Sequence, residues 1–295
     1  MKIATKRKLE AYMFVIPAFI YILLVLGYPL VYNVVLALRN VNVQTFATKT
    51  DVFVGLQNFK DLFADPTFRK VFGNTLVFTI GCLVFQFTIG FLFALFFSKK
   101  FTLAGPIRGL VLVAYMMPMS VTALLGKNMF DVSSGVFNDL LMRLHLINAP
   151  VEWLLQGKTA MAAVIFMNCW VGIPFNMLLL TSGLTGISQD IYEAAEVDGA
   201  NRFQKFFKIT LPLVRPAIVA VLMLGFIYTF KAFDLQFVMT SGGPLNATDV
   251  LGTYSYQLSF TQYEFSKGSA SAIILFCCLL LVGLFYLRMI SKEDD

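Results

Sequence analysis

Charged residues are scarce in this chain. They make up 14% of its 295 residues, whereas hydrophobic residues make up 58% and phenylalanine alone occurs 31 times. A soluble domain carries about 25% charged residues, so this chain has far more apolar surface than a globular core of its length could bury. The composition excludes a water-soluble protein and predicts one that lies in a lipid bilayer.

Histidine and cysteine are also rare, and the motifs of common catalytic sites are missing. The single histidine, His145, has no companion at metal-ligand spacing and is interpreted as a solvated loop residue. The chain contains no Gly-x-x-x-x-Gly-Lys-Ser/Thr phosphate loop, Gly-x-Ser-x-Gly elbow or His-Glu-x-x-His site. We therefore expect no catalytic residue, metal site or cofactor in this chain, and any nucleotide must bind another polypeptide. We expect no structural disulfide either, because all four cysteines fall inside apolar segments: Cys82, Cys169, Cys277 and Cys278.

Six segments are long and apolar enough to cross about 30 Å of hydrocarbon, which takes about 20 helical residues. They lie at about 11–36, 72–97, 106–126, 159–182, 213–239 and 269–290. No internal repeat, flexible linker or low-complexity tract divides the chain. We predict an all-α integral membrane protein with six transmembrane helices in one domain, residues 1–295, and with both ends on the same side.

Lysine and arginine are distributed unequally between the two sides of these spans. Nine lie on the side away from the termini, on longer loops, so their density there is lower. Because cytoplasmic loops carry an excess of lysine and arginine, this bias predicts that both termini are cytoplasmic. The bias also accounts for the net charge of +6 and gives no reason to invoke nucleic acid. Thirteen lie on the side of the termini: Lys2, Lys6, Arg7, Lys8, Lys99, Lys100, Arg108, Arg202, Lys205, Lys208, Arg215, Arg288 and Lys292.

A polar segment at about 183–212 separates the fourth and fifth predicted spans. Ser188 can cap a helix at about 189–198, and Gly199 suits a left-handed helix end. A second short helix is expected to follow and to be interrupted by Pro212, which lacks a backbone N–H. Its residues divide between a basic face and an aromatic face: Arg202, Lys205 and Lys208 against Phe203, Phe206 and Phe207.

This segment contains Glu-Ala-Ala at 193–195, a glycine four residues beyond, and a trailing Leu-Pro at 211–212. It resembles the signature loop of permease subunits of ATP-binding-cassette importers. In that family the loop forms a coupling helix that docks in a groove of the cytoplasmic ATPase and transmits its opening and closing. A polar connector between membrane helices is the simpler alternative. The resemblance assigns ATPase coupling to Glu193, Ala194, Ala195, Asp198, Gly199 and Arg202.

Two outer segments resemble the carbohydrate branch of this family, of the maltose-importer-like subunit type. In the first, at about 53–63, apolar residues recur at helical spacing, which predicts a short amphipathic segment at the membrane surface. The second is the Thr-Ser-Gly-Gly-Pro sequence at 240–244. The family's large inserted outer domain is missing, because the loop between the first two spans has only about 35 residues.

The resemblance implies the partners and the mechanism of the chain. It implies a second homologous permease, two ATPase subunits that bind ATP and Mg, and an extracytoplasmic sugar-binding protein, assembled in the plasma (inner) membrane. It also implies alternating access, in which closure of the ATPases turns a cavity outward to receive the sugar.

Polar and aromatic residues in the fourth and fifth spans indicate where a sugar could bind. Asn168, Gly172 and Phe175 share one helical face, because they are four and three residues apart. Amides bond hydroxyl groups, and aromatic rings lie against the apolar faces of sugar rings. Ordinary helix packing is the alternative for each residue. The resemblance assigns substrate contacts to Asn168, Gly172, Phe175, Gly225, Tyr228 and Thr229.

Two charged residues and two other classes of transporter complete the hypotheses. Lys231 and Asp234 are expected to form an ion pair on the outer part of the fifth span, with a gating or binding role left open. The same machinery could import a polyol or a glycerol-phosphate-type solute, but an anionic cargo would want several cationic side chains at the cavity. A secondary transporter would show inverted repeats or a buried carboxylate in its core, and neither is seen.

Overall fold

The computed structural model describes residues 2–99 and 101–291, and the side chains of residues 12–99 and 101–289. Two positive charges counted above, Lys100 and Lys292, lie outside the described residues. The described part of the chain is helical, and its only extended pairing is an isolated bridge between Arg39 and Phe53. Five helices are long and apolar enough to cross a membrane, or six if one bent pair counts as a single span. The all-α prediction is confirmed.

The chain divides into two compact units, and the first comprises Met1–Asp65 with Ser255–Ile274. Asn58 joins two parts of this unit, because its side-chain amide donates to the carbonyl oxygens of Ala37 and Arg39 at 2.8 and 2.7 Å. Most apolar side chains from Tyr12 to Val35 are exposed, as expected of a helix that needs lipid or a partner around it. The elements of the unit are α1 (Lys2–Ile22), η1 (Leu23–Gly27), α2 (Tyr28–Ala37), α3 (Val43–Thr48), α4 (Gln57–Ala64), η3 (Gln257–Thr261) and the first part of α15 (Phe265–Ser291).

Helix α4 falls within the segment predicted to be amphipathic at 53–63. Leu62 is buried, whereas Leu56 and Phe63 are exposed. The helix therefore has one packed apolar position and leaves other apolar side chains uncovered within the chain. Its place at the membrane surface stays a prediction.

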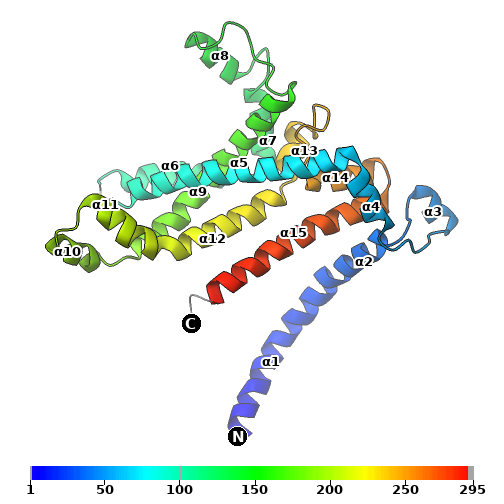
Figure 1. Ribbon diagram of the computed structural model, residues 1–295, viewed down its shortest axis with the longest axis horizontal. Coiled ribbons are helices and arrows are strands. Elements are labelled where there is room, and N and C mark those ends of the chain that lie inside the picture. The colour runs from blue at the N-terminus through cyan, green and yellow to red at the C-terminus, as the bar shows by residue number, and fades with distance from the viewer. Residues whose placement is uncertain (1, 100, 292–295) are drawn as a thin grey trace. The chain divides into compact units, whose positions relative to one another are not determined.

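Three long helices form the centre of the second unit, which comprises Pro66–Tyr254 with Leu275–Asp295. They are α5 (Pro66–Phe97), α9 (Gly157–Thr185) and α12 (Leu211–Phe230), and they pack against one another (Figure 1). Small residues allow the close approach. A β-carbon on Gly90 of α5 would lie 2.6 Å from the Cβ of Asn176 in α9, and one on Gly183 would lie 2.6 Å from the Cβ of Ala217 in α12. Such small-residue contacts are typical of packed membrane helices.

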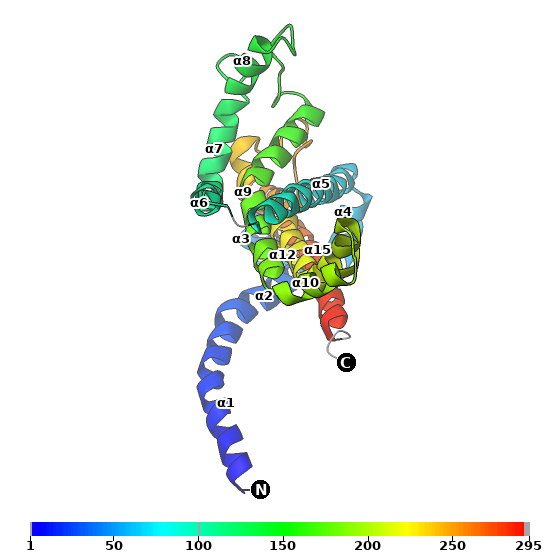
Figure 2. The same ribbon diagram turned by 90° about the vertical axis from the view of Figure 1, so that its left-hand side faces the viewer.

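The third predicted span, 106–126, is wrong as a single helix. The structure has α6 (Ala104–Tyr115) and α7 (Met119–Met129), which meet at an angle of 90°. Figure 2 shows α6 nearly end-on where α7 runs lengthwise. The cause is Pro118, which lacks an N–H and disfavours helical geometry in the residue before it. Pro118 instead takes an extended ψ of 138° and begins α7.

The predicted interruption at Pro212 is also wrong. Helix α11 (Arg202–Lys205) continues through a π-helical turn, η2 (Phe206–Thr210), into α12. The wider turn makes the Leu211 N–H bond to the Phe206 carbonyl, five residues back. Because Pro212 follows this wider turn, as one of the first residues of α12, its missing donor and its ring are accommodated without breaking the helix.

The fifth predicted span, 213–239, divides into two helices. Helix α12 ends at Phe230, and α13 (Asp234–Met239) begins after a short break. Asp234 lies in the first turn of α13, where its carboxylate interacts favourably with the helix dipole and supports a new start. Helix α13 packs against α7 and α9. The unit also contains α8 (Val136–Arg143) and the first four residues of α14 (Leu251–Tyr256).

The break separates Lys231 from Asp234, so the expected ion pair between them is wrong. Lys231 caps the end of α12, and its Nζ lies 5.4 Å from the centroid of the Tyr228 ring. Both charged residues are exposed within the chain. Lys231 is therefore held by an aromatic face rather than by a carboxylate.

Candidate functional site

The loop between α9 and α12 has the local structure that its sequence predicts. Helix α10 (Gln189–Val197) begins at Ser188, whose side chain accepts a hydrogen bond from the Asp190 N–H. It ends at Gly199, which has a φ of +75°. The N–H of Gly199 donates to the main-chain carbonyl of Glu196 at 3.0 Å, and the N–H of Ala200 donates to the main-chain carbonyl of Ala195 at 2.9 Å. These two bonds form a Schellman motif, which needs a left-handed residue and so favours glycine.

A second cap and two side-chain contacts fold α11 back against α10. Asn201 and Gln204 form a reciprocal capping box at the start of α11. Lys205 donates to the Glu196 carboxylate at 2.5 Å, and the hydroxyls of Tyr192 and Thr210 are 2.9 Å apart. The hydrogen bond from Lys205, together with its charge, lowers the pKa of Glu196. The two short helices therefore form one defined surface feature.

Most side chains assigned to ATPase coupling project from this feature. Glu193, Ala194, Asp198, Gly199 and Arg202 are exposed, and Ala195 is half-buried. Two apolar side chains project with them, because Val197 is 89% and Phe203 is 77% exposed. A polar connector has no need to expose large apolar side chains, whereas a surface that docks a partner does.

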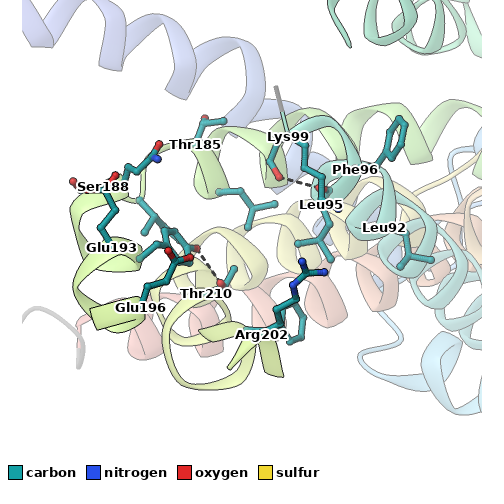
Figure 3. A pocket seen from close by; sticks show the side chains of 16 residues that line it. Leu92, Leu95, Phe96, Lys99, Thr185, Ser188, Glu193, Glu196, Arg202 and Thr210 are labelled. Carbon is teal, nitrogen blue, oxygen red and sulfur yellow. Dashed lines mark hydrogen bonds between the residues drawn. The ribbon is translucent and has the colours of Figure 1, made fainter. Parts of the chain in front are cut away.

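A cavity of about 1230 Å³ lies between this feature and the end of α5. Figure 3 shows Glu193 and Glu196 on one side of it and the apolar side chains of Leu92 and Phe96 on the other. Arg202 also lines it. Glu193 and Arg202 thus lie together at the cavity, whereas Asp198 and Gly199 lie at the turn outside its lining. The cavity is an open, charged hollow beside the loop.

The second cavity lies between the long helices and has a volume of about 430 Å³. All six residues assigned to substrate contact line it, and they come from two helices of the same unit. Helix α9 contributes Asn168, Gly172 and Phe175, and helix α12 contributes Gly225, Tyr228 and Thr229. The structure therefore brings together residues that are up to 61 positions apart in the chain. Their contact with a substrate stays a prediction.

Aromatic rings form one wall of this second cavity. The rings of Tyr115 and Phe175 are stacked, with centroids 5.6 Å apart. The rings of Phe175 and Tyr228 form an edge-to-face pair, with centroids 6.0 Å apart. Tyr228 remains 56% exposed, so its ring is available to a molecule in the cavity. Offset and edge-to-face pairs of this kind hold rings in fixed orientations.

Uncharged polar groups complete the lining. Asn168 and Thr229 are 7% and 5% exposed, and Gln86 of α5 is 4% exposed. None of the residues that line this cavity in the described part of the chain carries a charge. The combination of amide, hydroxyl and aromatic groups can bind a molecule that has both hydroxyl groups and apolar ring faces.

Four lining residues were not predicted from the sequence: Gln86, Tyr115, Met119 and Val171. A signal for Gln86 was present, because a glutamine within an otherwise apolar span is costly in lipid and tends to face a pathway. Tyr115 and Met119 have no such signal. They reach the cavity because the chain bends between α6 and α7.

Comparisons with known proteins agree with this architecture. The family described as "Binding-protein-dependent transport system inner membrane component" matches residues 86–292. The chain is 33% identical over 242 residues to the sulfoquinovosyl glycerol transport system permease protein of Agrobacterium fabrum, covering 82% of this chain and 78% of that protein. It is 33% identical over 240 residues to the trehalose/maltose transport system permease protein of Thermococcus litoralis, covering 80% and 79%.

A solved structure has the same fold. A chain in the crystal structure of a bacterial ABC transporter involved in the import of the acidic polysaccharide alginate matches with a TM-score of 0.82. The two chains are 24% identical, and the match covers 98% of each. The helical arrangement therefore extends over nearly the full length of both chains.

Proposed function

The chain belongs to the family of binding-protein-dependent transport system inner membrane components, and we propose that it is the permease subunit of an ATP-driven importer whose cargo is a sugar or oligosaccharide. As a member of that family it is an integral inner-membrane protein and not an enzyme. The resemblance recognised in the loop at 183–212 is thereby confirmed at the level of the family.

The observation that supports a sugar cargo is the uncharged cavity between α5, α9 and α12. Its amide and hydroxyl groups suit sugar hydroxyls, and the rings of Phe175 and Tyr228 suit the apolar faces of pyranoses. The name of one relative, which refers to trehalose and maltose, supports the same class of cargo. The name of another refers to sulfoquinovosyl glycerol, a sugar derivative that carries a sulfonate, and supports a sugar but not a neutral one.

The proposed mechanism is alternating access driven from the loop at 183–212. Helix α10 docks in a groove of the ATPase, and ATP-driven closure turns the cavity outward to receive the sugar. Hydrolysis resets it. The complex contains this chain, a second homologous permease, two ATPase subunits that bind ATP and Mg, and an extracytoplasmic sugar-binding protein. The two compact units of this chain act in it as one permease domain, with both termini cytoplasmic.

Two other hypotheses have less support. An anionic cargo such as a glycerol phosphate would want several cations at the cavity. The described residues that line it include none, and Lys231 lies over the ring of Tyr228. A secondary transporter would want a buried carboxylate for ion coupling in its core. The structure does bury a carboxylate, that of Asp249, but it is not among the described residues that line the cavity.

The test is uptake by the importer reconstituted in vesicles with its ATPases and its binding protein. Radiolabelled maltose, trehalose, sulfoquinovosyl glycerol and glycerol 3-phosphate are offered, with ATP or with an ion gradient alone. We expect ATP-dependent uptake of at least one neutral sugar. Uptake driven by the gradient without ATP would make the chain a secondary transporter. Uptake of only the anionic compounds, sulfoquinovosyl glycerol or glycerol 3-phosphate, would replace the neutral sugar by an anionic cargo.

A further inference from the structure

Gln86 carries a carboxamide from α5 into the cavity that α9 and α12 line. The side chain is 4% exposed, and it is the residue through which α5 lines this cavity. Its Nε2 donates to the main-chain carbonyl oxygen of Asn168 at 3.2 Å. This bond fixes which end of the amide faces which way, because an Oε1 atom placed against the same carbonyl would be repelled.

The remaining end of the amide is an acceptor. Oε1 receives no hydrogen bond from the residues that the structure describes, and it is not among the fully enclosed atoms that lack a partner. Oε1 is therefore open to the cavity, and leaving it without a hydrogen bond is costly when a cargo displaces the water there. It therefore needs a donor from whatever occupies the cavity.

The position of Gln86 is held by close packing on α9. A β-carbon on Gly172 would lie 2.2 Å from Cδ and 2.5 Å from Oε1 of Gln86. The carboxamide therefore lies directly over the backbone of Gly172, in space that a β-carbon would take unless Gln86 moved. One turn further along α5, Gly90 packs against Asn176 and keeps the two helices together. One hydrogen bond to the Asn168 carbonyl and the packing on Gly172 therefore orient Gln86 before any cargo arrives.

From this geometry we propose that Gln86 is a specificity-determining residue that binds a cargo hydroxyl through Oε1. The inference rests on the proposed sugar cargo and extends it. A hydroxyl can donate to Oε1, whereas a phosphate, carboxylate or sulfonate oxygen at this point cannot donate and would be repelled. The site therefore selects the neutral, hydroxyl-bearing part of the cargo at the place where α5 and α9 meet. Gly172, in turn, provides room for Gln86 rather than a contact of its own.

The experiment compares Gln86→Met with the wild-type importer in vesicles, using the neutral sugar that the wild type transports. Methionine keeps the length and removes both the donor and the acceptor. Uptake is measured at saturating binding protein, so that its rate depends on the permease and not on capture of the sugar. Sugar binding to the detergent-purified complex is measured separately, without binding protein. We expect sugar affinity to fall about 5- to 150-fold, the loss typical of an unmatched buried polar partner.

Monodeoxy analogues of the same sugar separate recognition from mere support of the helices. In the wild type, one deoxy position should lose about as much affinity as Gln86→Met loses with the parent sugar. The Gln86→Met importer should no longer distinguish that analogue from the parent. If Gln86→Met instead lowers the affinity for the parent sugar and for every deoxy analogue by the same factor, Gln86 is a structural residue and the inference is overturned.

A matched control and a measurement on the unmodified protein keep the inference testable if Gln86→Met does not assemble. Gln236 of α13 is a fully buried glutamine outside this cavity, and Gln236→Met should leave sugar affinity unchanged. In the wild type, a monofluoro analogue at the critical position should bind as weakly as the deoxy analogue, because fluorine cannot donate. Full affinity for all deoxy and fluoro analogues would refute a donor requirement. If no neutral sugar is transported at all, the proposed cargo itself is wrong.

Discussion

The turn at Gly199 allows the proposed coupling role to be tested through backbone strain alone. Gly199 has a φ of +75°, and a β-carbon built on it meets no atom within 4 Å. A substitution therefore causes no clash within the chain, and its cost is the left-handed conformation, about 1–2 kcal/mol for an ordinary residue and more for a β-branched one. That energy lowers the population of the intact turn by about 5- to 30-fold.

Three substitutions at Gly199 should follow the order of this strain. Gly199→Asn should dock the ATPase nearly as well as the wild type, since asparagine tolerates the left-handed region. Gly199→Ala should be weaker and Gly199→Val weakest. The assay is copurification of the ATPase, together with the ratio of sugar transported to ATP hydrolysed in vesicles. Normal docking and coupling in Gly199→Val would refute the reasoning. Equal loss in all three would mean that partner contact, rather than strain, requires the glycine.

Three further predictions concern the loop, the helix packing and the topology. The pKa of the Glu196 carboxyl should lie below its ordinary value of about 4.3, and Lys205→Met should return the pKa to that value. Because the pKa is depressed in the folded protein, the contact with Lys205 stabilises the loop fully above the ordinary pKa, and this stabilisation is lost as the pH falls through the depressed pKa. An NMR titration in which the variant leaves the midpoint unchanged would show that Lys205 is not the cause. Gly90→Ala should lower the free energy of unfolding by about 1–3 kcal/mol. Gly73→Ala should be tolerated, because a β-carbon at that position meets no atom within 4 Å. Equal melting temperatures for the two variants would contradict the close packing at Gly90. In intact cells, an impermeant thiol reagent should label a single cysteine at position 145 but should not label one at position 201. The reverse pattern would place the termini outside.

Local signals in the sequence predicted the elements that depend on neighbouring residues. Ser188 and Gly199 define the two ends of α10 through hydrogen bonds that span only a few positions. Apolar runs of sufficient length identify the long helices for the same reason. Shared helical faces also placed Asn168, Gly172 and Phe175 together, since the spacing of a helix is regular.

The errors arose where a proline or a helix break depends on its surroundings. Pro118 bends one predicted span by 90°, whereas Pro212 is absorbed by a π-helical turn. Both lack the same hydrogen bond, so the residue type alone could not distinguish them. The expected pair of Lys231 and Asp234 failed because their spacing places them on one face only if the helix continues. Gln86 has a local signal, as a glutamine within an apolar span, but its packing against Gly172 depends on how α5 approaches α9, and packing between helices has no local signal.

The most direct test of the account is alanine substitution at Asn168, Phe175 and Tyr228, one at a time, in the reconstituted importer. The claim is that these residues line a sugar site whose function is separate from ATPase docking. Uptake affinity should fall about 5- to 150-fold for each variant, because a buried polar or aromatic contact typically contributes about 1–3 kcal/mol. Complex assembly and basal ATP hydrolysis should stay at wild-type levels. Unchanged uptake in all three variants would contradict the account and return the residues to ordinary helix packing.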